Sequence, residues 1–321
     1  MKYLRYCLLI VLLPVVMAAS PAVRLQQDGS DEPQTIVVDV DRVNVLFTVK
    51  DKNGKLITNL KQDDFRLEED GRPQSIIKLN IDHDLPLNIA MLVDQSGTVQ
   101  SQMKLEQDAA IEFLNKTLKH GKDRAIVISF DSDVYALAPY KFTDSIEDLS
   151  TSIRKILAGG GTAMFDALYL ATQKFLSKEP QRRLIVLISD GQDNNSRNAT
   201  EAEVWQLVQK NEVLVYAISP NVTGSMPNGD SKDRDRGDKA LRNVAALTGG
   251  RAYFPKRVTD LEADFQSINE EVRSQYSLIY SSTNKSRDCN VFRRFKITPK
   301  DTRYKVSTRE GYYPCLAPAS K

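Results

Sequence analysis

Three short polar segments, far apart in the chain, carry side chains that could together hold a metal ion. They lie at residues 94–98, 159–162 and 189–193. They offer two carboxylates and three hydroxyls, those of Asp94, Asp190, Ser96, Thr98 and Thr162. An all-oxygen set of this kind suits Mg²⁺ or a similar hard cation.

The elements that must position these side chains are visible as apolar stretches. Residues 87–93 run into the first segment and residues 184–188 into the third, and both stretches are rich in β-branched residues. Such stretches predict buried strands of a parallel sheet. Loops that follow the carboxyl ends of such strands converge into ligand sites. Each segment alone would more often be a turn or a helix cap, but their order along the chain predicts one metal site.

The stretch from 87 to about 275 alternates predicted strands and helices. Further strands are expected at 125–130 and 213–218, and helices near 145–157, 164–178, 201–210, 241–247 and 259–275. An earlier helix should bury Leu105, Ala109, Phe113, Leu114 and Leu118, and the last one Leu261, Phe265, Ile268 and Val272. The fold class predicted is α/β, with a doubly wound, mostly parallel sheet flanked by helices.

Both flanks of this stretch show the period of two that is typical of β-strands. Residues 36–82 hold two Asp/Asn-Gly turn signals, and a similar pattern returns over 276–315. Neither part has enough strands to be stable alone. We therefore expect one small antiparallel β-sandwich built from both chain ends, with the α/β domain inserted, and a polar linker over 20–35.

The first residues, 1–19, have the pattern of an export signal peptide. Lys2 and Arg5 precede an apolar stretch, 7–17, which is too short to span a bilayer and is followed by small residues. This predicts a secreted or periplasmic protein without membrane insertion after cleavage, although an uncleaved anchor is an alternative. Cleavage would lower the basic count from 44 to 42, against 42 acids. Such a balance gives no indication of a nucleic-acid partner, and the oligomeric state stays open.

Cleavage would also remove Cys7 and leave Cys289 and Cys315. A lone pair of cysteines in an oxidising compartment usually forms a disulfide, so we expect this bond, with two unpaired thiols as the alternative. The absence of a CxxC motif or a nearby histidine argues against metal binding by these thiols.

The pattern Asp94-x-Ser96-x-Thr98, followed by Thr162 and Asp190, resembles the metal-ion-dependent adhesion site of von Willebrand factor type A domains. The chain is also similar to a secreted bacterial, acidobacterial-type group of proteins related to von Willebrand factor A. Segments 48–54, 64–71 and 309–313 carry that wider similarity. The family's first motif usually ends in serine; the threonine found here offers the same hydroxyl.

This resemblance implies that Ser96 and Thr98 bind the cation directly and that Thr162 binds it directly or through water. Asp94 and Asp190 would supply charge, often through bridging waters. A coordination position held by water could then accept an Asp or Glu carboxylate of a protein ligand. The expected cofactor is Mg²⁺, with Mn²⁺ or Ca²⁺ as alternatives. The expected function is an exported, metal-dependent protein-binding module; the alternative is a scaffold subunit of an envelope complex in which the metal is structural.

An enzyme is not expected, because the two histidines lie in no motif with a nucleophile and no phosphate loop occurs. Asp166 and Asp193 could support the metal site, but a solvated or capping role is the better interpretation. The long polar segment 219–238 predicts a loop on the metal face, either a binding loop or an insertion. Its Arg236-Gly237-Asp238 tripeptide is interpreted as a chance match to an integrin-recognition sequence.

Overall fold

The computed structural model describes residues 42–81, 85–97, 103–179, 182–219, 231–286 and 288–314. Within these ranges no helix is both long and apolar enough to cross a bilayer. The predicted signal peptide, the 20–35 linker, Thr98 and Cys315 lie outside them. The predicted Cys289–Cys315 disulfide therefore stays a prediction.

The α/β part is built on a six-stranded sheet whose order is β10-β9-β8-β5-β6-β7. All neighbours in it pair in parallel except β7, which joins the edge antiparallel. The strands are β5 (Leu87–Asp94), β6 (Arg124–Phe130), β7 (Val134–Ala136), β8 (Arg182–Ile188), β9 (Val213–Ile218) and β10 (Ala252–Tyr253). β7 and β10 were not predicted, because two or three residues are too few to show a period.

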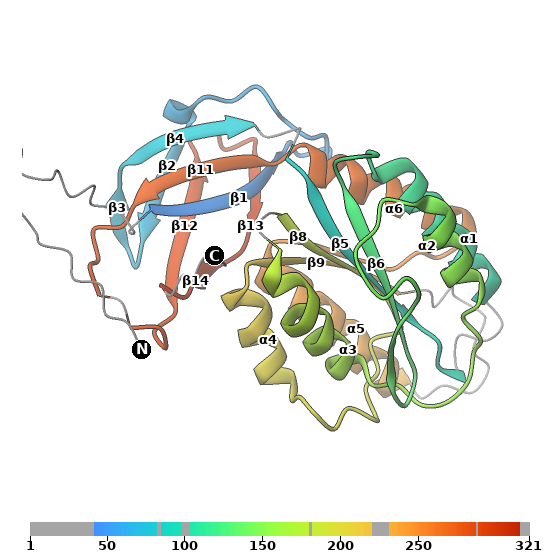
Figure 1. Cartoon of the computed structure of the whole chain (residues 1–321). Helices are drawn as coiled ribbons and strands as arrows, with labels where there is room; N and C mark the ends of the chain where they lie inside the picture. The colour runs from blue at the N-terminus through green and yellow to red at the C-terminus, as the bar shows by residue number, and fades with distance from the viewer. Residues whose placement is uncertain are drawn as a thin grey trace, which may run out of the picture. The chain divides into compact units, whose positions relative to one another are not determined.

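In the described part of the chain, six helices cover the two faces of this sheet (Figure 1). They are α1 (Met103–Thr117), α2 (Ile146–Arg154), α3 (Met164–Leu170), α4 (Glu201–Lys210), α5 (Ser231–Thr248) and α6 (Val258–Arg273). α3 continues through a π-helical turn, Ala171–Phe175, and a 3₁₀ turn, Leu176–Lys178. Along β5, Ile89 and Met91 pack with α1, α2 and α6, whereas Ala90 and Leu92 pack with α3, α4 and α5. The doubly wound fold is confirmed.

The apolar face predicted for the last helix is confirmed, and the one predicted for α1 is confirmed in part, since Phe113 and Leu114 are buried. Leu261, Phe265, Ile268 and Val272 of α6 are all buried against the sheet. In α1, Leu105 and Ala109 are only half-buried. Their neighbours Glu106, Gln107, Ala110 and Ile111 are buried instead. The buried face of α1 is thus wider than the apolar spacing predicts, because two polar residues, Glu106 and Gln107, also occupy buried positions.

The prediction of a polar loop over 219–238 is wrong from residue 231 onward, where α5 begins. Lysine and arginine are good helix formers, and charges four residues apart can pair along a helix, as Asp238 and Arg242 do at 3.7 Å. The charged composition that indicated a loop is therefore compatible with an exposed helix face.

The two chain ends form two four-stranded antiparallel sheets, as expected from the sequence. One has the order β13-β1-β11-β4 and the other β14-β12-β2-β3. The strands are β1 (Arg42–Lys50), β2 (Phe65–Glu69), β3 (Arg72–Gln74), β4 (Ile76–Ile81), β11 (Tyr276–Ser281), β12 (Arg293–Pro299), β13 (Lys305–Thr308) and β14 (Gly311–Tyr312). The chain that follows the second predicted turn forms two short strands, β3 and β4, which belong to different sheets. Phe47 of β1 stacks on Tyr276 of β11, with ring centroids 5.1 Å apart, inside the shared core.

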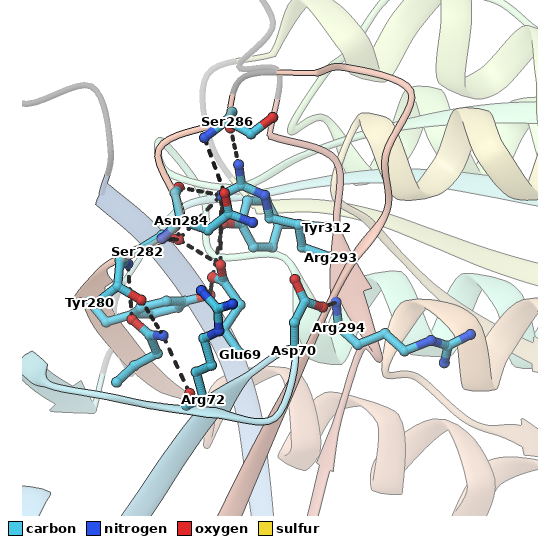
Figure 2. A network of polar contacts seen from close by, with 12 residues as sticks. Glu69, Asp70, Arg72, Tyr280, Ser282, Asn284, Ser286, Arg293, Arg294 and Tyr312 are labelled. Carbon is cyan, nitrogen blue, oxygen red and sulfur yellow. Dashed lines mark hydrogen bonds and ion pairs between the residues drawn. The ribbon is translucent and has the colours of Figure 1, made fainter.

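A buried ion pair lies in the core between these two sheets (Figure 2). Glu69, 2% exposed, accepts hydrogen bonds from the hydroxyls of Tyr280 at 2.6 Å and Tyr312 at 3.0 Å. The Arg293 guanidinium lies 3.6 Å from the same carboxylate and donates to Ser282 at 3.2 Å. Four strands from both chain ends, β2, β11, β12 and β14, contribute to this network, so it ties the two sheets together.

A second buried carboxylate holds together the beginning and the end of the α/β part. Asp123, which is fully buried, accepts the backbone N–H of Leu87 at 2.9 Å and that of Lys119 at 2.8 Å. The guanidinium of Arg273, at the end of α6, pairs with the same carboxylate. The first residue of β5 and the last residue of α6 thus share one partner.

Candidate metal centre

The three sequence segments meet at the carboxyl ends of the central strands because their backbones are hydrogen-bonded to one another. Gly97 N–H donates to the carbonyl of Gly160 at 3.2 Å, and Gly159 N–H donates to the carbonyl of Gln95 at 2.7 Å. These two bonds join the loop after β5 to the 159–162 loop. Gly160 adopts a φ of +79°, a conformation that favours glycine.

The 159–162 loop is joined in turn to the loop after β8. The Thr162 carbonyl accepts the backbone N–H groups of Asn194 at 3.0 Å and Asn195 at 2.9 Å. The Thr162 N–H donates to the Asn194 side chain at 2.8 Å. All three segments are therefore part of one hydrogen-bonded unit.

Four of the five predicted ligands lie in this unit and are buried, whereas Thr98 lies outside the described residues. Asp94 is fully buried, Ser96 and Asp190 are 1% exposed, and Thr162 is 3% exposed. One Asp94 oxygen accepts the Ser96 N–H at 2.9 Å, and the other accepts the Ser189 hydroxyl at 2.7 Å. Their role as metal ligands stays a prediction.

Ser189 was not predicted to have a role in the site, although its position beside Asp190 could have indicated one. Its hydroxyl donates to Asp94 and also accepts the Gly191 N–H at 3.1 Å. The Asp190 carboxylate accepts the Gln192 N–H at 3.0 Å. Ser189 thus links the two carboxylates of the site through the backbone of the Ser-Asp-Gly turn.

The electrostatics of the site favour a cation. Burial, with the neighbouring charge of Asp190, raises the pKa of Asp94 to about 7, although hydrogen bonds from Ser189 and Ser96 lower it. The cost of holding two buried carboxylates close together falls when a divalent cation lies beside them. Oxygen donors of both kinds, charged and neutral, fit Mg²⁺ or a similar ion.

The hydroxyls are essential to this fit. No group of three or more His, Cys, Asp or Glu side chains in the described ranges is arranged to hold a metal. A cation here would therefore depend on Ser96 and Thr162 as well as on Asp94 and Asp190, in agreement with the mixed donor set that the sequence predicts.

Asp193 caps the start of α3, as interpreted from the sequence, whereas Asp166 lies within α3 and is 8% exposed, so it is neither solvated nor a cap. Asp166 accepts the N–H groups of Asn198 at 2.9 Å and Ala199 at 3.0 Å. Asp193 accepts the N–H of Phe165 at 2.8 Å, in the first turn of α3. Both carboxylates fix the loop that carries Asn194 and Asn195.

The Arg236-Gly237-Asp238 tripeptide lies inside α5 and not in a loop. A Cβ on Gly237 would lie 2.3 Å from the Asp190 carbonyl oxygen, and one on Gly191, whose φ is +77°, would lie 2.3 Å from the Gly237 carbonyl oxygen. Glycine at 237 thus lets α5 pack directly on the turn that carries Asp190. The sequence interpretation missed this supporting contact, for which a glycine within a charged run was the available signal.

Comparison with known sequences agrees with this architecture. The sequence profile of the von Willebrand factor type A domain matches residues 88–271. The human von Willebrand factor A domain-containing protein 3B is 31% identical over 170 residues, which are 52% of this chain and 12% of that protein. The protein sll0103 of Synechocystis is 29% identical over 141 residues, 43% of this chain and 33% of that protein. The matched regions thus span a third or less of these relatives.

Solved structures show the same fold at low identity. A von Willebrand factor type A protein from Catenulispora acidiphila is 13% identical with a TM-score of 0.51; the match covers 85% of this chain and 72% of that one. Proximal thread matrix protein 1 from the mussel byssus, with a zinc-occupied MIDAS motif, is 17% identical with a TM-score of 0.50; the match covers 65% and 50%. The profile match spans more than half of the sequence, and the chain belongs to the von Willebrand factor type A domain family.

Proposed function

We propose that this protein is an exported, metal-ion-dependent protein-binding module, which captures a carboxylate of a protein ligand on a divalent cation. One observation carries the proposal: three loops are hydrogen-bonded into one unit that buries Asp94, Ser96, Thr162 and Asp190 beyond the carboxyl ends of β5 and β8. Ligand sites of α/β sheets form at that edge. Domains of the family to which the chain belongs are typically interaction modules, and neither matched relative is named as an enzyme.

Each residue would contribute in a different way. Ser96 and Thr162 offer neutral hydroxyl oxygens, and Asp94 and Asp190 offer charge. Asp94 is held in place by Ser189 and by the Ser96 backbone. A bound cation would supply an open coordination position for an external Asp or Glu carboxylate. Mg²⁺ is the cation that we propose, with Mn²⁺ or Ca²⁺ as alternatives; the zinc reported at the MIDAS motif of the mussel protein supports a divalent ion.

The finer parts of the proposal rest on the sequence. The signal-like residues 1–19 support a secreted or periplasmic location, and the similarity over 48–54, 64–71 and 309–313 supports membership of the acidobacterial-type group. The alternative, a scaffold subunit in which the metal is structural, shares all these features. It differs in whether a partner needs the metal.

Calorimetric titration of Mg²⁺ into the purified mature protein tests the site itself. We expect saturable one-site binding that is absent from an Asp94→Ala/Asp190→Ala variant, because that variant lacks both charges that attract the cation. Circular dichroism would verify that the variant is folded. Equal binding by the two proteins would place the cation elsewhere and refute the site.

Replacing Thr162 with alanine separates adhesion from scaffolding. The adhesion proposal predicts that proteins captured from the source envelope extract are lost in EDTA and in this variant, while the fold is retained. Acetate at high concentration should compete for capture, whereas acetamide, which has a similar shape and no charge, should not. Capture that is indifferent to EDTA, acetate and the Thr162→Ala change would favour the scaffold.

A further inference from the structure

Glu106 is an acidic side chain that is buried without a hydrogen-bond partner among the described residues. It lies in the first turn of α1 and is 1% exposed. Both of its carboxylate oxygens are buried and accept no hydrogen bond from the described part of the chain. Its neighbour Gln107 is also buried but donates to the Ile156 carbonyl at 2.9 Å. Buried charges are normally paired or coordinate metals, so the isolation of Glu106 requires an explanation.

Other buried carboxylates of this protein show how the fold normally accommodates them. Glu69 has two tyrosine hydroxyls, a serine and the Arg293 guanidinium around it. Asp123 has two backbone N–H groups and Arg273. Among the acidic side chains in the described ranges, only Glu106 has buried oxygens that lack a partner. Glu106 has none of the partners that stabilise these other carboxylates, so a purely structural role does not explain its burial.

The surroundings of Glu106 point to the metal centre. Burial raises its pKa well above the usual value, and the charges of Asp94 and Asp190 raise it further. Three carboxyl groups, each 1% exposed or less, thus lie close enough for their charges to act on one another.

We propose that Glu106 is a third acidic group of the metal centre, acting on the bound cation through an intervening water molecule. The proposal rests on the proposed function, since it requires a cation at the Asp94–Asp190 site. A bridging water is needed because Glu106 does not form a cluster with the two aspartates that could hold the metal directly. With Glu106 ionised, three negative charges would face the two positive charges of the cation and retain it when no protein ligand is bound.

Glu106→Gln, which keeps the shape and removes the charge, tests this role. We expect Mg²⁺ and Mn²⁺ affinity, measured by calorimetry, to fall about tenfold to a hundredfold, as is usual when a supporting group of a metal site is lost. In EDTA the melting temperature of the same variant should fall less than that of the native protein as the pH is raised, because glutamine has no proton to lose at this buried position. Glu112→Gln is the matched control: Glu112 lies on the same helix, is 45% exposed and pairs with Lys116. It should change neither quantity.

The outcomes distinguish this inference from the proposed function. Native protein that binds Mg²⁺, with a Glu106→Gln variant that binds equally well, would make Glu106 a neutral buried acid and overturn the inference alone. Native protein that binds none of Mg²⁺, Mn²⁺ and Ca²⁺ would overturn the proposed function and this inference with it. Glu106→Met, apolar and of similar volume, provides a second charge-free variant if the glutamine variant does not fold, and the same loss of affinity is expected from it.

Discussion

Replacing Asp94 with asparagine is expected to abolish Mg²⁺ binding and, at the same time, to stabilise the metal-free protein. The pKa of Asp94 rises from 3.8 to about 7 in the folded protein, mainly through burial. Such a carboxyl favours the folded state most when it is protonated. Its ionisation destabilises the fold progressively as the pH rises from about 4 to about 7, by about 4 kcal/mol in total. The asparagine side chain can still accept from the Ser96 N–H but carries no charge.

Urea unfolding in EDTA at pH 5 and pH 8 measures this effect. The native protein should lose about 3 kcal/mol more stability than Asp94→Asn does between these two pH values, since most of the Asp94 ionisation lies between them. Saturating Mg²⁺ at pH 8 should restore the stability of the native protein and leave the stability of the variant unchanged. Asp108→Asn, an exposed change on α1 where Asp108 pairs with Arg154, serves as the control. Equal changes in stability with pH for the native protein and Asp94→Asn would show that the ionisation of Asp94 does not destabilise the fold.

Replacing Glu69 with glutamine is expected to destabilise the β-sandwich by about 3–5 kcal/mol. The change removes the negative charge that faces Arg293, and breaking a buried pair by removing one partner leaves the other charge uncompensated. Arg293 is 3% exposed, so water cannot replace the lost carboxylate. The combination Glu69→Leu/Arg293→Met should be much less damaging, because buried pairs are often replaceable by apolar residues.

Two optical probes localise the damage. The chain has one tryptophan, Trp205 on α4, whose ring packs on Phe165 in the α/β part. Far-ultraviolet circular dichroism reports on all strands and helices. The Glu69→Gln variant should show a lower urea midpoint by circular dichroism, and the Trp205 fluorescence midpoint will follow it only if the two parts unfold together. Unchanged midpoints by both probes would contradict the importance of the pair.

Elements whose signals are local could be predicted closely from the sequence. The strands that carry Asp94 and Asp190 follow from apolar stretches, and α4 begins and ends as predicted. Its start is marked by Thr200, which caps the Glu203 N–H at 3.4 Å, while Glu203 accepts the Thr200 N–H at 2.8 Å. The order of the three polar segments was enough to predict which loops converge.

Features that depend on distant partners could not be predicted in this way. A period of two cannot show that the chain changes sheets between β3 and β4, because both strands have one face toward the same core. The pairing of Glu69 with Arg293 joins residues more than two hundred positions apart. Glutamate is a common residue on exposed helix faces, so only the packing of α1 shows that Glu106 is buried. Gly237 resembled part of a flexible loop because its contact, the Asp190 turn, lies on another element.

The position of Asp123 has a consequence for how the sandwich closes. β11 pairs with both β1 and β4. The paired residues Ile81 of β4 and Tyr276 of β11 are separated by roughly 190 residues of the chain. If those residues were a flexible coil, bringing the two chain ends together would carry a large loop-closure entropy. Asp123 instead binds both Leu87 and Arg273, so folding of the α/β part already brings its own two ends together. Once the α/β part is folded, it connects the two halves of the sandwich as a short turn would. The loop-closure entropy of pairing β11 with β1 and β4 is then close to that of a local hairpin.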